Sequence, residues 1–262
     1  MISLIIPVFN NIESIFLVFE SIIKNLSIND QLIIIDDCST DGTWEALLSL
    51  REKKYKFDFI LDRNHKNLGI SSTLNLGIKY ATKKYIARHD GDDIILNHRF
   101  KYQLEILNNN NHIDLLASSK LIIRNYNYQN NINSVYECVK EKPKLLNRNS
   151  LALENLITHP SIICKAYILK ENIYDKSYNA KGEDYHLWLR LIKKNIKLYI
   201  DKTPVILYFE NNYDSKIKKQ LLGSIKVRLL SINLKYPIFC FHLIIGSMLD
   251  FLRLIYIFIK HA

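Results

Sequence analysis

The sequence predicts an α/β fold in which helices cover both faces of a mostly parallel central sheet. Short apolar runs alternate with amphipathic segments through the first third of the chain, an alternation that is typical of such sheets. The apolar runs are almost continuous, as expected for strands that are buried on both faces. With 262 residues, of which 48% are hydrophobic and 24% are charged, the chain is long enough for one domain with a substantial core.

The first strand is expected from Ile2 to Val8, an apolar run interrupted only by Ser3 and Pro7. Apolar residues then recur at helical spacing from Ile12 to Asn25. The same two patterns predict the following elements in chain order: strand Leu32–Ile35, helix Trp44–Arg51, strand Phe57–Leu61, helix Ile70–Ala81, strand Tyr85–Ala87, helix Asn97–Leu107, one or two strands within Leu115–Arg124, and helical spacing around Ser150–Ile157. The Asn-rich intervals 108–111 and 125–133 are expected at the surface.

Carboxylates follow two of the predicted strands directly. Asp36 and Asp37 come after the second strand, and Asp90, Asp92 and Asp93 come after the strand that ends at Ala87. In parallel sheets of this kind, ligands gather at the carboxyl ends of the strands. Because all these ends meet at one edge, we expect the two acidic groups to lie on the same side of the sheet as the turn that follows the first strand.

Crowded carboxylates at the end of a buried strand repel one another and are costly to bury without a partner. A hard divalent ion such as Mg²⁺ or Mn²⁺ takes oxygen ligands and can keep coordination positions open for substrate phosphates. The alternative is a solvated acidic turn before the helix expected near Asn97. Asp36 or Asp37 could equally cap the next turn through side-chain hydrogen bonds, and a lone aromatic such as Phe9 is more often a core residue.

A second distinctive stretch is Gly182–Leu191. Glu183 and Asp184 would lie at the N-terminus of a helix, where the helix dipole favours negative charge. The buried face of this helix would carry Tyr185, Trp188, Leu189 and Ile192. The two carboxylates are either a capping pair or groups held ionised at the rim of a pocket, ready to accept a proton. His159, which precedes Pro160, is by itself more often structural than functional.

Several classes of protein are not indicated. The sequence contains neither G-x-G-x-x-G nor G-x-x-x-x-G-K-S/T, so a dinucleotide oxidoreductase or a P-loop enzyme is not expected. The four cysteines are scattered without a Cys-x-x-Cys pair, which argues against a zinc site or disulfide framework and fits a reducing compartment. The N-terminus lacks the basic region and cleavage site of a signal peptide, so we expect a cytoplasmic protein.

Five stretches occur in a characteristic order: Ser3–Asn10, Ile35–Thr43, Asn67–Gly69 with Asn75, Asp90–Asp93, and Gly182–Arg190. Together they resemble the family 2 glycosyltransferases over roughly residues 2 to 210, and five motifs in register are far more specific than any one of them. The resemblance implies a GT-A fold and an inverting transfer of a sugar from a nucleotide-diphosphate donor, with a UDP-sugar as the expected donor, in a metal-dependent enzyme of the hexosyltransferase type.

The resemblance also implies residue roles on the nucleotide side. Pro7 and Phe9 match residues that line the nucleoside pocket in the family. Asp37 matches a residue that contacts the base, with Asp36 beside it.

Further roles concern the metal and the reaction. Asp92 is implied as the direct ligand of a divalent metal, Mn²⁺ or Mg²⁺, and Asp90 as a contact to ribose or metal. Asp184 falls at the position of the catalytic base. His159 and Glu183 fall in the vicinity of the acceptor or the diphosphate.

This sequence departs from the family pattern at two basic positions. Many relatives have a Tyr-Arg pair after the last core strand, where Tyr208 is followed here by Phe209. Another position that is often basic, just before Asn75, is Leu74. Either positive charge for the phosphates comes from elsewhere, with Lys202 or the segment Lys216–Lys219 as candidates, or the activity is reduced.

The last fifth of the chain forms a basic, apolar tail. From residue 213 onward it contains eight Lys or Arg and two Asp, with apolar residues at helical spacing between Asp214 and Leu234. Pro237 ends that pattern, and the apolar run from Ile238 is interrupted by Asp250 before it reaches the 20 or so residues of a spanning helix. Either an amphipathic helix lies on the inner leaflet of a membrane, or the helix packs on the protein's own core.

We therefore predict a GT-A domain at residues 1–212, with a nucleotide-sugar-binding half at 1–124 and an acceptor-side half at 125–212, followed by a membrane-associating helical tail at 213–262. The acceptor would be a glycan or a polyprenyl-diphosphate-linked sugar in bacterial surface polysaccharide synthesis (O-antigen, lipopolysaccharide or capsule), at the cytoplasmic face of the inner membrane.

Two other functions were considered. A nucleotidyltransferase that makes a nucleotide sugar would carry a Gly-rich basic loop after the first strand, which is missing at Pro7–Asn11. A non-catalytic nucleic-acid-binding protein is suggested only by the net charge of +10, much of which lies in the apolar tail, so no nucleic-acid partner is expected.

Overall fold

The apolar runs of the N-terminal half form a parallel sheet. In the computed structural model, which describes residues 1–262 except 125–141, 180–181, 211–212, 233–236 and 261–262, β1 pairs in parallel with β2 on one side and with β4 on the other, and β3 pairs in parallel with β2. The elements of this half are β1 (Ile2–Val8), α1 (Ile15–Asn25), β2 (Gln31–Asp36), α2 (Thr43–Arg51), β3 (Asp58–Arg63), α3 (Ile70–Tyr80) and β4 (Tyr85–Arg88). The predicted order of strands and helices is confirmed.

The second half extends the same sheet with mixed pairing. Its elements are β5 (Ile94–Ile95), α4 (Arg99–Asn109), β6 (Leu115–Arg124), β7 (Lys144–Leu145), α5 (Arg148–Leu153), η1 (His159–Ser161), β8 (Ile163–Lys165), α6 (Ala166–Glu171), η2 (Lys176–Tyr178), α7 (Glu183–Lys193) and β9 (Leu198–Glu210). The strand order is β3-β2-β1-β4-β8-β6-β9-β5, with β7 paired to β9. β8 runs antiparallel to both β4 and β6, whereas β6 and β9 are parallel.

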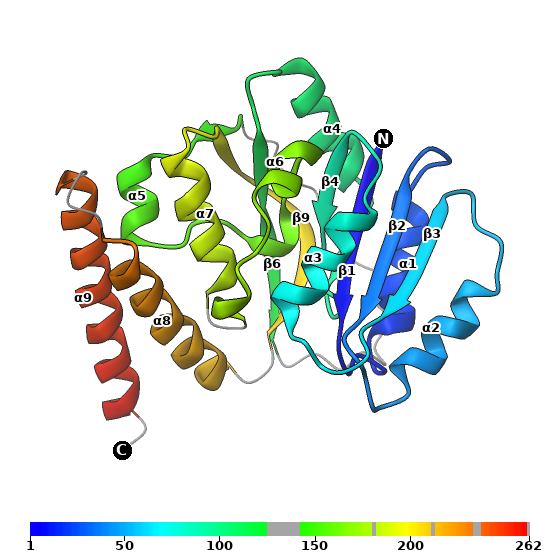
Figure 1. Ribbon diagram of the computed structural model, residues 1–262, viewed down its shortest axis with the longest axis horizontal. Helices are drawn as coiled ribbons and strands as arrows, with labels where there is room; N and C mark the ends of the chain where they lie inside the picture. Colours follow the sequence, from blue (N-terminus) through cyan, green and yellow to red (C-terminus); the bar gives the residue numbers. More distant parts are fainter. Residues whose placement is uncertain (125–141, 180–181, 211–212, 233–236, 261–262) are drawn as a thin grey trace.

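Helices cover both faces of the sheet, as the alternating pattern predicts, and a hydrophobic core lies on each face. One core includes Leu74, Trp188 and Leu243 from α3, α7 and the C-terminal helix. The other includes Phe19, Leu47 and Phe100 from α1, α2 and α4. The fold class is therefore the predicted mixed α/β architecture, with a central sheet between two helical layers (Figure 1).

The sequence patterns misplace some boundaries. The first helix begins at Ile15 and not at Ile12, because the chain first makes a turn in which the carbonyl of Asn11 accepts hydrogen bonds from the amides of Ser14 and Ile15. β5, β7 and β8 have two or three residues each, too few to show a periodic pattern. The interval 125–133, which we expected at the surface, lies outside the described residues.

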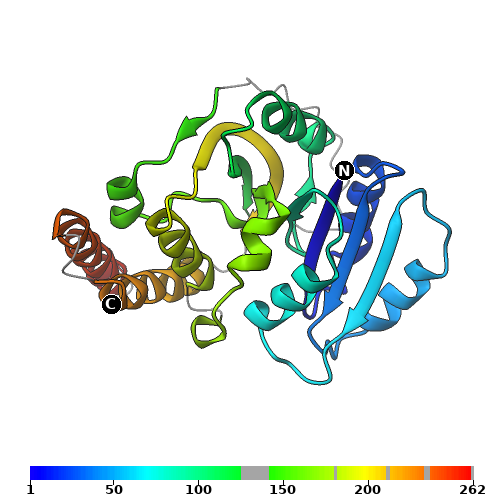
Figure 2. The same ribbon diagram turned by 45° about the horizontal axis from the view of Figure 1, so that its top comes forward.

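The tail forms two long helices, α8 (Tyr213–Leu230) and α9 (Pro237–Lys260), which lie side by side at the end of the molecule opposite β3 (Figures 1 and 2). Pro237 does not interrupt a helix but begins α9, a position where its missing N–H has no cost. α9 packs on α5 and α8, and α8 contacts α7. Contrary to the expectation that Asp250 cuts the apolar run short, Pro237–Ile257 is long and apolar enough to cross a membrane by length and composition, and it is the one such helix within the described residues. Of its most apolar stretch, 39% is buried inside the fold.

Candidate functional site

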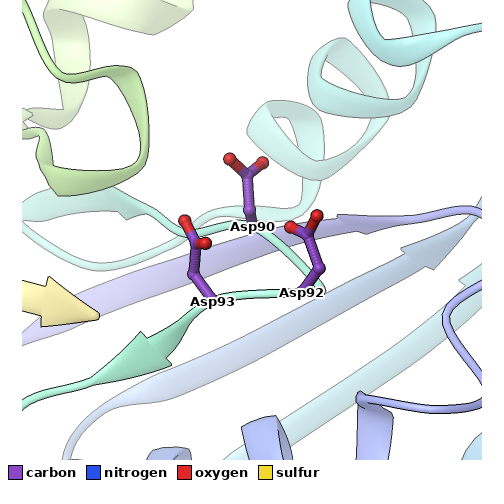
Figure 3. A group of neighbouring side chains, drawn as sticks. All are labelled: Asp90, Asp92 and Asp93. Atoms are coloured by element: carbon purple, nitrogen blue, oxygen red, sulfur yellow. The ribbon is translucent and has the colours of Figure 1, made fainter. Parts of the chain in front are cut away.

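The carboxyl ends of β1, β2 and β4 meet at one edge of the sheet, as their parallel pairing requires. The turn that follows β4 carries Asp90, Asp92 and Asp93, whose side chains project to the same side of the turn (Figure 3). Gly91 lets this turn approach the end of β1 closely, because a Cβ atom there would lie 3.0 Å from Asn11 Oδ1 and 3.2 Å from Val8 Cγ2. The turn therefore packs closely against the end of β1.

The three carboxylates after β4 form a group suited to a cation. One oxygen from each lies within 4.8 Å of the others. Asp93 is only 1% exposed; its Oδ1 accepts a hydrogen bond from the Phe209 amide, while its buried Oδ2 has no hydrogen-bond partner. Burial, and then the charges of Asp90 and Asp92, raise the pKa of Asp93 well above its ordinary value. A hard divalent ion would relieve both the repulsion and the unpartnered oxygen, so these residues fit such an ion.

Arg88, the last residue of β4, was not singled out from the sequence. Its side chain is 4% exposed, and Nη2 forms an ion pair with Asp90. Nε and Nη1 are buried and have no hydrogen-bond partner. Burial, the largest single influence, lowers the pKa of Arg88, but the charge of Asp90, with smaller contributions from Tyr174 and Asp93, more than offsets it, so the pKa is raised and the guanidinium stays protonated. The signal that was available is a charged residue at the end of a strand whose other residues are apolar.

The N-terminus of α7 holds the second acidic pair. Gly182 precedes the helix with φ of +90°, a left-handed conformation that favours glycine. Burial raises the pKa of Asp184, and a hydrogen bond of 3.0 Å from Asn155 Nδ2 to Asp184 Oδ2 opposes that rise. Burial and the charge of Asp184 raise the pKa of Glu183 to about 7. Asp184 is thus positioned by an amide donor at a helix end that favours its ionised form.

His159 lies in η1 and is buried. Its Nε2 is 2.7 Å from the hydroxyl of Tyr174, and its ring packs edge-on against Trp188. Burial, and then the positive charge of Arg88, lower the pKa of His159 well below its ordinary value. The histidine is therefore a neutral side chain held by neighbours, as expected for a structural residue, although it also faces the cavity described next.

A cavity of about 1340 Å³ brings most of the predicted site residues together. The residues of this set that line the cavity are Asp90, Asp92, His159, Glu183 and Asp184, and Arg88 lines it as well. The cavity continues beyond them to α8 and α9, where its walls include Lys219, Arg228, Leu252 and Tyr256. One hollow therefore joins the turn after β4, the start of α7 and the two tail helices.

The predicted residues on the nucleotide side do not line this cavity. Asp36 is completely buried, accepts hydrogen bonds from the amide and hydroxyl of Ser39, and forms an ion pair of 3.0 Å with Arg63. Asp37 accepts hydrogen bonds from Asn64 Nδ2 at 2.7 Å and from two backbone amides, those of residues 68 and 69, at 2.8 and 2.7 Å. Both carboxylates thus hold neighbouring loops in place.

The turn after β1 differs from this pair because its aromatic side chain is open to solvent. Phe9 is 45% exposed, so it is not a core residue, and Pro7 is half-buried beside it. An exposed aromatic ring at the carboxyl end of a parallel strand can stack on a flat ligand.

The candidate cations for phosphate neutralisation also differ in whether they line the cavity. Lys219 lines the cavity, whereas Lys202 is exposed outside it, and the side chain of Lys216 lies outside the described residues. Lys120, which sequence reasoning missed, also lines the cavity, with its Nζ 3.5 Å from the centre of the Tyr208 ring. Leu74, at the position that is often basic in relatives, is buried in the core.

Comparison with known proteins gives one family and one fold. The family model described as "Glycosyl transferase family 2" matches residues 3–171. The chain is 33% identical over 197 residues to an uncharacterized glycosyltransferase of Methanocaldococcus jannaschii, which covers 74% of this chain and 65% of that relative. It is 26% identical over 199 residues to UDP-Glc:alpha-D-GlcNAc-diphosphoundecaprenol beta-1,3-glucosyltransferase WfaP of Escherichia coli. That match covers 75% of this chain and 72% of the relative.

The M. jannaschii relative and several others are longer than the matched region; an uncharacterized glycosyltransferase of Rickettsia felis, for example, is matched over 32% of its length. Among solved structures, S. aureus TarS 1-349 in complex with UDP-GlcNAc has a TM-score of 0.64 at 16% identity, covering 87% of this chain and 65% of that one. The mannosyltransferase PcManGT from Pyrobaculum calidifontis, in complex with GDP-Man and Mn²⁺, has a TM-score of 0.66 at 12% identity, covering 94% and 73%. At these identities the two structures show the shared GT-A fold alone.

Proposed function

The chain belongs to glycosyl transferase family 2, and from that premise we propose that it is an inverting, metal-dependent enzyme that moves a sugar from a UDP-sugar to the hydroxyl of a lipid-linked acceptor. The observation that carries the proposal is that Asp90, Asp92 and Asp184 line one cavity although they come from two distant parts of the chain. Family membership favours sugar transfer over nucleotidyl transfer, the alternative raised above.

Asp90 and Asp92 would hold the divalent ion, with Asp93 behind them. When bound, such an ion stabilises the negative charge that develops on a departing nucleoside diphosphate. The unpartnered Oδ2 of Asp93 and the close approach of the three carboxylates support this assignment. Asp90 and Asp92 line the cavity, so an ion that they held would be within reach of the phosphates of a donor bound there.

Asp184 would act as the general base. The acceptor hydroxyl attacks the anomeric carbon of the donor sugar; its oxygen forms the new glycosidic bond, the bond to the diphosphate breaks, and the proton passes to the Asp184 carboxylate. The hydrogen bond from Asn155 orients that carboxylate, and the start of α7 favours its ionised form before the reaction. Glu183, with a pKa of about 7, is suited to donate a hydrogen bond to a substrate hydroxyl below that pH.

Arg88 would supply the positive charge that the family pattern places elsewhere. Arg88 lines the cavity beside Asp90, and two of its nitrogens, Nε and Nη1, are buried without a hydrogen-bond partner. A buried guanidinium with free donors is matched to a diphosphate oxygen or to a polar group of the donor sugar. Lys120 and Lys219, which line the same cavity, would add to this field.

The donor and acceptor classes are proposed from relatives. The names of two E. coli relatives, WfaP and WfgD, describe transfer from UDP-Glc to alpha-D-GlcNAc-diphosphoundecaprenol. For this chain we propose a UDP-sugar donor, a polyprenyl-diphosphate-linked acceptor and peripheral binding at the cytoplasmic face of the membrane, within the synthesis of a bacterial surface polysaccharide. Pro7 and Phe9 would contact the base of the donor, with Asp36 and Asp37 shaping the adjoining loop.

The experiment has a binding part and a turnover part. A panel of nucleotide sugars is screened for thermal stabilisation of the protein with and without Mn²⁺, since a ligand that binds only the folded state raises its apparent stability. The best donor is then used to compare wild type with Asp184→Asn, which should keep donor affinity and lose on the order of 10² to 10⁴-fold in transfer rate. Glu171→Gln, an exposed carboxylate outside the cavity, is the control. Wild-type turnover in Asp184→Asn would remove the base assignment, and no stabilisation by any nucleotide sugar would refute the proposed function.

A further inference from the structure

The exposed face of α9 is apolar, the reverse of what a helix on the surface of a soluble domain normally shows. The exposed side chains recur at helical spacing along one face: Phe241, Ile244, Met248, Leu252, Ile255 and Tyr256. The opposite face packs on α5 and α8 through Phe239, Leu243 and Leu254. A contiguous apolar surface of this kind marks a binding site for an apolar partner.

A buried ion pair holds α9 against the domain. Arg228 of α8, 1% exposed, pairs with Asp250 of α9 and donates hydrogen bonds to the carbonyls of Ala152 at 2.9 Å and Leu153 at 2.6 Å in α5. Its Nε also lies 3.0 Å from the hydroxyl of Tyr185, the residue that follows Asp184 in α7. Pulling α9 away would leave these buried charges unpaired, so the tail helices keep a set position relative to the proposed base.

The apolar face of α9 continues into the cavity. Leu252 and Tyr256 are 60% and 68% exposed, and both line the cavity that contains Asp184. At about 1340 Å³ this cavity exceeds the roughly 300–1,000 Å³ of most small-molecule sites, which leaves room for an acceptor beside the donor. An apolar ligand could therefore touch the α9 face and reach the carboxylates without leaving the protein surface.

Cationic side chains accompany this apolar wall. Arg253 of α9 lies between Leu252 and Tyr256 in the sequence, and Lys219 of α8 is exposed; both line the cavity. Arg253 is half exposed, and its Nη1 forms ion pairs with Glu154 Oε1 at 3.3 Å and with Asp250 Oδ1 at 3.2 Å. Exposed cations beside an apolar surface are complementary to a ligand with an anionic group at the end of a hydrocarbon chain.

We propose that the α8–α9 wall of the cavity, formed by Leu252, Tyr256, Arg253 and Lys219, binds the isoprenoid chain and the diphosphate of a polyprenyl-diphosphate-linked acceptor. The inference rests on the proposed function of the same cavity and adds the surface on which the lipid part of the acceptor binds. The chain lies along the exposed face of α9, the diphosphate meets the cations, and the sugar at the other end reaches Asp184. The ion pair between Arg228 and Asp250 keeps this wall in a fixed position relative to α7.

The test uses the full-length protein and two matched variants of α9. Leu252→Asp changes a residue that lines the cavity, whereas Phe241→Asp changes a residue on the same exposed face about three turns earlier that does not line it. Both side chains are mostly exposed, so neither change should disturb folding, which circular dichroism and the Tm check. Affinities are measured for farnesyl diphosphate, inorganic pyrophosphate, and UDP with Mn²⁺, together with binding to vesicles that contain anionic lipid.

Farnesyl diphosphate should bind wild type at least tenfold more tightly than pyrophosphate does. Leu252→Asp should weaken farnesyl diphosphate roughly 10- to 100-fold, because one apolar side chain is lost from the site, and leave UDP binding unchanged. Phe241→Asp should leave the affinities for farnesyl diphosphate and UDP unchanged.

Equal affinities for farnesyl diphosphate and pyrophosphate would overturn the proposal. A loss of vesicle binding in both variants, with no change in farnesyl diphosphate affinity, would also overturn it. A concentration-dependent dimer that both variants abolish, again without an effect on farnesyl diphosphate, would also overturn it and assign the face to a second copy. UDP binding is read separately, so its absence would refute the donor site and not the lipid site.

Discussion

The turns that follow β2 and β4 lie at the same edge of the sheet and both are acidic, yet their carboxylates have opposite environments. After β2, Asp37 accepts three hydrogen bonds and Asp36 is paired with Arg63 and Ser39. After β4, Asp93 keeps an unpartnered buried oxygen, and Arg88 keeps two unpartnered buried nitrogens.

This difference separates a structural role from a ligand-binding one. Carboxylates whose oxygens are all engaged by the protein order the loops around them, and their removal leaves buried donors unsatisfied. Buried polar atoms without hydrogen-bond partners are costly, so they persist where a ligand completes them. The turn after β4 is therefore the part of this edge that we expect to gain most on binding metal and donor, whereas the turn after β2 should be complete without them.

The largest expected effect is the loss of metal-dependent donor binding in Asp92→Asn. Removing even an indirect support of a metal ligand typically costs 10- to 100-fold in metal affinity, so losing a direct ligand should cost about 100-fold or more. Isothermal titration with the best UDP-sugar at several Mn²⁺ concentrations measures this. Asp175→Asn, which changes a carboxylate outside the cavity, should titrate as wild type. An unchanged metal titration in Asp92→Asn would contradict the assignment.

Asp37→Asn should instead lower the stability of the ligand-free protein by about 1–3 kcal/mol, because an amide nitrogen replaces one of two oxygens that accept three hydrogen bonds. Urea unfolding monitored by circular dichroism gives this free energy. Asp92→Asn, measured in the same way, should leave stability unchanged or raise it, since it relieves repulsion among crowded carboxylates. An equal loss of stability in the two variants would contradict the distinction between a structural turn after β2 and a ligand-binding turn after β4.

Arg88→Met should weaken binding of the UDP-sugar about tenfold, the value of one charge-assisted hydrogen bond. Arg88→Lys keeps the charge but not the planar fork of donors, so it should recover part of the affinity. Arg51→Met, at an exposed position in α2, controls for loss of net charge. Donor affinity equal to wild type in Arg88→Met would show that the unpartnered N–H groups serve the protein and not the donor.

The smallest expected effect is a pH dependence carried by Glu183. Its pKa is raised from 4.5 to about 7 in the folded protein, so between these values the folded state binds more protons than the unfolded state. Stability of the protein free of metal and donor should therefore fall as pH rises, by about 1 kcal/mol from pH 5 to pH 6. Glu183→Gln should flatten this part of the profile in urea unfolding at several pH values, while Glu171→Gln should not. A profile that is the same in wild type and Glu183→Gln would exclude the raised pKa.

Much of the fold could be predicted because its central strands are continuous apolar runs and its helices have one apolar face. The patterns gave no range for β9 and missed the short helix α6. They also missed β5, β7 and β8, whose two or three residues cannot show a period and whose existence depends on pairing with neighbours such as β9. The same limit applies to the tail. Residues 228 and 250 lie in different helices, and no local pattern pairs them, so sequence reasoning left open whether the tail packs on the domain.

Most of the acidic residues of the candidate site could be predicted from the sequence. Carboxylates after strands, an acidic pair at a helix start and the order of five motifs led to Asp90, Asp92 and Asp184, which the structure brings to one cavity. Arg88 was missed because a single arginine at the end of a short strand has no pattern of its own. Its significance lies in two donors without partners, which can be recognised only when the surrounding residues are in place.

By itself, the sequence determined the fold class, the order of the strands along the chain and the acidic turns that end them, because each of these follows from residues close together in the chain. Only the tertiary structure decided which carboxylates are satisfied by the protein, which buried polar atoms remain without hydrogen-bond partners, and that the apolar face of α9 opens into the same cavity as Asp184. The physical reason is that burial and hydrogen-bond satisfaction depend on contacts between residues far apart in the chain, such as Asp37 with the amide of residue 69 and Arg228 with Tyr185.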